Sequence, residues 1–110
     1  MAYDEVLAER VRALLAAREG LTERKMFGGI GFMIGGNMAC GASSGGDLIV
    51  RVDPEDYERA LGEPGVREFD MTGRRMRGWI LVDPGSVADD ESLAGWVDAG
   101  ADFASSLPPK

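Results

Sequence analysis

Hydrophobic residues recur at two different spacings along the chain, and the change of spacing marks a change of element. Between Tyr3 and Glu19, aliphatic residues lie at helical spacing with charged residues among them, namely Val6, Leu7, Val11, Leu14 and Leu15. This period predicts an amphipathic helix that ends at Gly20. In the glycine-rich stretch that follows, Ile30, Phe32 and Ile34 alternate with other residues, which predicts a strand.

Short extended runs divide the middle of the chain. They predict strands at 30–34, 38–41, 48–52, 67–71 and 78–82. The residues Gly35, Gly36 and Asn37 tolerate positive φ and favour a hairpin between the first two strands. The polar cluster at 43–47 and the basic stretch "TGRRMR" at 72–77 are typical of turns. Three or four strands are therefore expected before the next helix and two after it.

Capping residues indicate two further helices. Asp53 is an N-cap candidate, and Pro54 follows it at the first helical position, so a short helix is expected through about Leu61. The stretch "DDES" at 89–92 can cap a last helix. The apolar side of that helix carries Leu93, Trp96, Val97, Phe103 and Leu107.

The element order predicts the fold class. Strands joined by short turns favour an antiparallel sheet, so we expect an α+β, two-layer sandwich of five to six strands with helices on one face. The chain has 110 residues, of which 45% are hydrophobic, enough for one core. A single domain spanning 1–110 is expected.

Composition excludes several classes of function. Histidine is absent, which removes the usual serine and cysteine triads and histidine-containing zinc sites. The net charge of −7 opposes non-specific attraction to nucleic acid. The chain has one cysteine, no export-type segment and no apolar run long enough to span a membrane, so a cytoplasmic protein without a membrane partner is expected.

Candidate chemical sites have simpler structural interpretations. Gly29, Gly31 and Gly35 miss the dinucleotide-loop spacing and lead into strands, so they favour close backbone packing over a phosphate cradle. Cys40 lies in an apolar strand and is expected to be a buried thiol. The acids at 89–91 favour helix capping over metal binding, and the scattered methionines favour core filling. No catalytic residue, cofactor or metal site is expected.

Charge is distributed unevenly. Basic residues fall in the predicted strands and turns, at Arg24, Lys25, Arg51, Arg74, Arg75 and Arg77. The region from Asp89 to Asp102 holds five acids and no base. Two interpretations stay open: a solvated face with intramolecular ion pairs, or a surface for an anionic partner. Trp79, beside the basic stretch, and Trp96, on the last helix, are each either a core anchor or part of a partner-binding surface.

Several motifs together resemble the TfoX/Sxy N-terminal domain family. They are "RKMFGGIGFM", "LIVRV" leading into "DPEDYERAL", "FDMTGRRMRGW" and "LAGWVDAGADFASSLPPK", and the resemblance covers essentially the whole chain. It implies a fold similar to type III secretion chaperones. It also implies non-enzymatic, coactivator-like regulation of natural competence and of cyclic-AMP receptor protein promoters. Those regulators carry a second, C-terminal domain, so a stand-alone N-terminal domain ending at Lys110 is expected here.

The resemblance and the charge pattern together suggest an interaction surface. Its candidate residues are Arg24, Lys25, Arg51, Arg74, Arg75, Arg77 and Trp79. The expected partner is a protein, for example a component of the transcription machinery. The alternatives are direct nucleic-acid binding through the same basic patch and small-molecule binding. A homodimer is a further option, because a basic edge and an acidic helix can complement each other across a two-fold axis.

Overall fold

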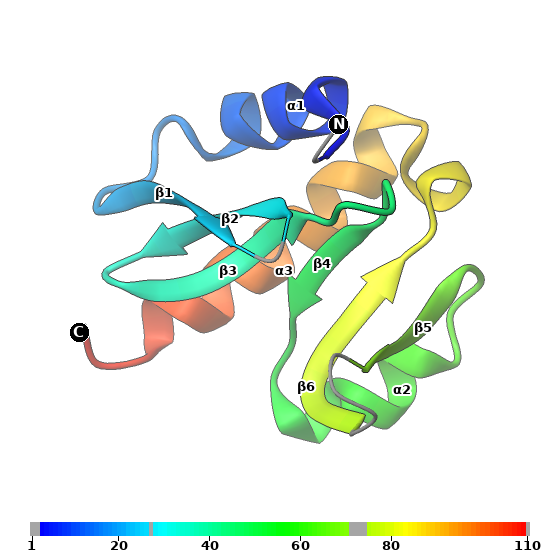
Figure 1. The fold of residues 1–110 in the computed structure, drawn as a ribbon. Coiled ribbons are helices and arrows are strands. Elements are labelled where there is room, and N and C mark those ends of the chain that lie inside the picture. Colours follow the sequence, from blue (N-terminus) through cyan, green and yellow to red (C-terminus); the bar gives the residue numbers. More distant parts are fainter. Residues whose placement is uncertain (1–2, 27, 71–74, 110) are drawn as a thin grey trace.

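Six strands form one antiparallel sheet in the order β1-β2-β3-β4-β6-β5 (Figure 1). The computed structural model describes residues 3–26, 28–70 and 75–109. The strands are β1 (Leu21–Met26), β2 (Gly29–Ile34), β3 (Asn37–Ala42), β4 (Leu48–Arg51), β5 (Val66–Asp70) and β6 (Arg75–Val82). The helices are α1 (Glu5–Leu15), α2 (Tyr57–Leu61) and α3 (Asp90–Ser106), with short 3-10 turns η1 (Pro54–Asp56) and η2 (Pro84–Val87).

The helices form the second layer. The helix α3 packs on β3 and β4, α1 packs against α3 and β3, and α2 packs on β5 and β6 (Figure 1). The predicted α+β class, the antiparallel sheet and the upper strand number are confirmed.

Local capping explains where the helices begin. The Asp4 carboxylate accepts hydrogen bonds from the Val6 and Leu7 backbone N–H groups at 2.9 and 3.2 Å. The Asp53 side chain caps η1, and Asp89 caps α3, as their sequence context predicts. The predicted first helix was too long: α1 ends at Leu15, and Gly20 lies beyond it with φ +77° in the following turn.

Strand β1 was not identified from the hydrophobic pattern. Its sequence, LTERKM, lacks apolar alternation because β1 is an edge strand whose exposed positions, 22–25, are all polar. Its pairing with β2, from Leu21 opposite Ile34 to Met26 opposite Gly29, defines it as a strand. This strand accounts for the fourth strand that the turn pattern left open.

The core lies between the sheet and the helices. Directly opposed residues on neighbouring strands point to the same face, so the register defines rows across the sheet. One buried row contains Ile30, Ala42, Leu48 and Val82, and the next contains Phe32, Cys40, Val50 and Ile80. Alternation along each strand places the intervening residues on the opposite, helix-free face.

Glycines in the region 28–41 serve the backbone. Gly35 and Gly36 turn β2 into β3 with φ +61° and +85°. A Cβ built on Gly41 would lie 2.5 Å from the Ile30 carbonyl oxygen, and one on Gly29 would collide with the Ala42 carbonyl oxygen. Larger side chains at these positions would push neighbouring strands apart, which fits the structural interpretation of this stretch.

An ion pair joins α1 to the edge of the sheet. The Arg12 side chain donates from Nε and a terminal nitrogen to the two Glu23 carboxylate oxygens at 2.5 and 2.8 Å. This bidentate hydrogen bond lowers the pKa of Glu23 below its ordinary value of 4.5. Glu23 therefore contributes stability above pH 4.5 that is lost as pH falls through its lowered pKa.

Replacing Glu23 by glutamine should cost about 0.5–1 kcal/mol of unfolding free energy at neutral pH, because both partners are partly solvated. Urea denaturation at neutral pH and at about pH 3 checks this, since the difference from wild type should shrink in acid. The matched control is Glu19→Gln at an exposed loop position. An equal loss in both variants, or a Glu23→Gln loss independent of pH, would contradict the assigned role.

Candidate interaction surface

The face of the sheet opposite the helices, called the open face here, carries one row of aligned residues from edge to edge. The row consists of Arg24, Gly31, Gly41, Ile49, Leu81 and Arg67. Five strand spacings separate its two arginines by about 24 Å. The row is therefore apolar and flat in the middle, with a cation at each end.

Methionines fill the space beside the two glycines. Met33 lies opposite Met38 in the β2–β3 register, and both are half-buried. The Met38 methyl group lies 2.9 Å from where a Gly41 Cβ would be, so its side chain covers that glycine. The expectation that methionines fill the core was wrong for this pair. Flexible thioether side chains on an open sheet face are typical of adaptable binding surfaces.

An arginine–aromatic cluster lies beside this apolar centre. The Arg51 guanidinium carbon is 5.2 Å from the Trp79 ring centroid and 5.5 Å from that of Phe103. The Phe69 and Trp79 ring centroids are 6.5 Å apart. Pairing of β3 with β4 ends at Val50, which leaves Arg51 accessible to Phe103 from α3. Within the described residues no carboxylate forms an ion pair with Arg51, so the aromatic rings are its partners.

The predicted surface residues separate into groups. Arg24, Arg51 and Trp79 lie on the open face. Lys25 is the next residue along β1 and therefore belongs to the side of the sheet that bears the helices. Arg77 also lies toward the helices, with its guanidinium 5.8 Å from the Tyr57 ring centroid of α2.

The predicted basic turn extended too far along the chain, into residues that belong to β6. Strand β6 begins at Arg75, so Arg75 and Arg77 belong to a strand and not to the turn predicted at 72–77. The reason is a strand interrupted at Gly78, where φ is +92°, so its alternation is not visible in the sequence. Arg74 lies outside the described residues, as does the side chain of Arg75.

Other open-face residues were missed from the sequence. Arg67 of β5 forms an ion pair with Asp47 at 2.7 Å, and Phe69 packs against Trp79. Both follow from pairing β5 with β6, because Arg67 lies opposite Leu81. Alternation within 67–71 was the only available signal, and it did not indicate which face was helix-free.

The acidic last helix is partly neutralised within the chain. Arg10 of α1 contacts Asp90 at 3.0 Å, and Arg18 contacts Asp102 at 2.9 Å and Asp98 at 3.4 Å. Both arginines come from α1 or the turn after it. Intramolecular ion pairing therefore accounts for part of the charge asymmetry, while the open-face arginines are separate from it.

Candidate chemical groups have structural roles in the described part of the chain. Cys40 is fully buried in the core, and desolvation raises its thiol pKa to about 12. The Asp89 carboxylate accepts from the Ser92 backbone N–H at 2.9 Å, and this bond lowers its pKa. Among residues 3–26, 28–70 and 75–109, no three or more potential ligands gather as a metal site.

The sequence matches a known protein family. The family model described as TfoX N-terminal domain matches residues 13–104. No curated protein and no solved structure matches the chain significantly. In the part of the chain that the structure describes, every helix is too short or too polar to cross a membrane.

Proposed function

The chain belongs to the TfoX N-terminal domain family, and from this premise we propose that it is a cytoplasmic, non-enzymatic domain that binds a partner protein in transcription regulation. The open face is its contact surface. The family supports a regulatory role because the TfoX/Sxy regulators that the chain resembles act on promoters without catalysis.

The open face supports protein binding because it combines an apolar centre with an arginine rim. Methionine, aromatic and arginine side chains are enriched in protein interfaces, and aromatic and arginine residues dominate their energetics. Here Met33, Met38 and Leu81 are half-buried at the centre, and the Arg51–Trp79 pair lies beside them. This arrangement is the observation that carries the proposal.

Charge defines the complementary surface. Arg24 is exposed and forms no ion pair among the described residues, and Arg67 is half-exposed despite its contact with Asp47. The partner should therefore present aliphatic or aromatic side chains framed by carboxylates. Two cations about 24 Å apart on a protein of net charge −7 fit this partner better than a continuous phosphate backbone.

The test is a quantitative pull-down from the native cell lysate. The baits are wild type, an Arg24→Glu/Arg67→Glu variant, and a control, Lys25→Glu/Arg59→Glu, with the same charge change on the helix-bearing side. Wild type and control should enrich a transcription factor or polymerase subunit, and the open-face variant should retain about a tenth of it or less, as expected for two lost interface charges.

The four substituted side chains are solvent-exposed, so all baits should be folded. Thermal midpoints close to that of wild type check this. Enrichment of the same regulator by the open-face variant would remove the open face from the proposal. If no regulator is enriched by any folded bait, the regulatory function fails. Saturable binding to labelled duplex DNA at low salt, lost in the open-face variant, would replace protein binding by nucleic-acid binding.

A further inference from the structure

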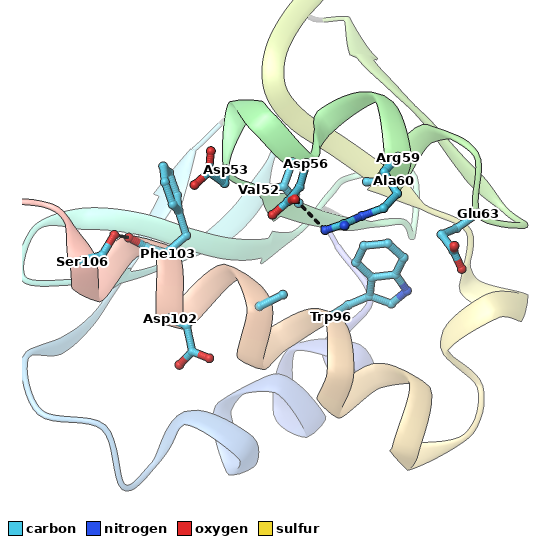
Figure 2. Close-up of a pocket in the computed structure, with 11 residues that line it drawn as sticks. Val52, Asp53, Asp56, Arg59, Ala60, Glu63, Trp96, Asp102, Phe103 and Ser106 are labelled. Atoms are coloured by element: carbon cyan, nitrogen blue, oxygen red, sulfur yellow. Dashed lines mark hydrogen bonds and ion pairs between the residues drawn. The ribbon is translucent and has the colours of Figure 1, made fainter.

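A groove lies between α2 and α3, in the helix layer. Figure 2 shows Arg59 and Ala60 on its α2 side and Trp96 and Phe103 on its α3 side. The hollow has a volume of about 530 Å³.

A second hollow extends this groove. It measures about 540 Å³ and is lined from Glu91 and Ser92 to Ala99. The two hollows share Glu63, Trp96 and Ala99, so they meet at the Trp96 side chain. Along α3 the lining residues run from Glu91 to Ser106, about 22 Å at the helical rise. This length exceeds that of a typical small metabolite and suits about four turns of a docked helix.

The groove has apolar surface at its base. Val52 and Ala60 are buried beneath it, and the rings of Trp96 and Phe103 are half-buried in its α3 wall. Trp96 packs against the core on one side while lining both hollows on the other. Half-buried aromatic rings of this kind can anchor aliphatic side chains and can also receive a cation on the ring face.

The rim is acidic. Carboxylates of the lining residues come from Asp53, Asp56, Glu63, Glu91 and Asp102. Arg59 also lines the groove, but it is paired with Asp56 at 2.5 Å, and Arg18 pairs with Asp102 at 2.9 Å. Glu63 and Glu91 are exposed and have no ion-pair partner in the described residues. Glu63 lines both hollows, and Glu91 lies at the far end of the second one, so uncompensated negative charge extends from the Trp96 side chain to one end of the groove.

We propose that this groove binds a basic amphipathic helical segment of a partner protein. Its apolar side chains pack on Trp96, Phe103 and the base of the groove, and its lysines or arginines face Glu63 and Glu91. The charge of the rim excludes acidic segments, and the length selects a peptide of several turns. Phe103 contacts Arg51, so the groove adjoins the Arg51–Trp79 pair at this end. The inference does not depend on the proposed function.

The test uses a synthetic peptide of about four helical turns, with lysines on one face and leucines on the other. A second peptide has glutamates in place of the lysines, and spermine serves as a small polycation. Amide chemical shifts of isotope-labelled protein report where each probe binds. The lysine peptide should shift residues 53–63 and 91–106 saturably, and the glutamate peptide should not.

Two variants locate the contacts. Glu63→Lys/Glu91→Lys should weaken the lysine peptide about tenfold or more, as expected for two lost charge pairs and two new repulsions. Its control, Glu5→Lys/Glu19→Lys, makes the same charge change at exposed positions outside the groove. Ala99→Trp, at an exposed position that lines both hollows, should block the groove while leaving the fold intact.

The proposal is overturned if the lysine peptide shifts only open-face residues, if the glutamate peptide binds equally, or if spermine produces the same saturable shifts. Unchanged binding in the folded Ala99→Trp and Glu63→Lys/Glu91→Lys variants would also overturn it. A concentration-dependent dimer that these variants dissociate would instead assign the groove to a second copy of the chain.

Discussion

Replacing Gly100 by leucine is expected to prevent the native fold, and replacing it by alanine should cost about 1–3 kcal/mol of unfolding free energy. Gly100 is buried where α3 crosses β3. A Cβ at this position would collide with the Ala39 carbonyl oxygen and lie 3.4 Å from Val50 Cγ1. The obstacle is backbone, so α3 would have to move away from the sheet.

Gly95 provides the matched control on the same helix. A Cβ there meets nothing within 4 Å, so Gly95→Ala should stabilise the protein by about 0.5–1 kcal/mol through helix propensity alone. Urea denaturation followed by circular dichroism compares the variants. If Gly100→Ala were as stable as Gly95→Ala, α3 would not pack on β3 closely enough for a Cβ at Gly100 to collide with the Ala39 carbonyl oxygen.

The thiol of Cys40 should react with iodoacetamide at least a thousandfold more slowly in the native protein than in guanidinium. Cys40 is fully buried between Phe32 and Val50 in a core row, so the reagent reaches it only when the domain opens. A domain stable by 5 kcal/mol or more is open less than about a thousandth of the time. Rapid labelling of folded protein near pH 8 would contradict this burial.

Burial of the same thiol should make the protein less stable in base, because burial raises the thiol pKa. Its pKa is 9.0 in the unfolded reference and about 12 when buried. Because the folded pKa is raised, the protonated thiol makes its full contribution to the free energy of unfolding below pH 9. Between pH 9 and 12 only the unfolded thiol ionises, so this contribution is lost. Denaturation over this range should show a weaker pH dependence for Cys40→Ala than for wild type. Equal slopes would exclude the thiol as the cause.

The interaction surface was predictable only in part. Arg24, Arg51 and Trp79 are candidates that the charge pattern and the family resemblance singled out, and the structure places all three on the open face. Lys25 and Arg77 have the same charge but lie toward the helices. Charge identifies basic residues without assigning them to a face. That assignment depends on strand alternation, which Gly78 interrupts between Arg77 and Trp79.

The groove was not predictable from any single segment. Trp96 and Phe103 were expected on the apolar side of the last helix, and both are half-buried there. Their exposed faces depend on the distance between α2 and α3, elements that are separated by two strands along the chain. Trp79 and Trp96 are both half-buried, yet they belong to different surfaces, because one lies on the sheet and the other on the helix layer.

The sequence by itself determined the features that depend on neighbours within a few residues. Asp53 and Asp89 set helix starts through hydrogen bonds to N–H groups two or three residues ahead, and Gly35 and Gly36 set the β2–β3 hairpin through their allowed φ. Only the tertiary structure decided that β1 is a strand and that Phe103 contacts Arg51. Those features depend on strand register and helix docking, whose energies come from residues distant in the chain.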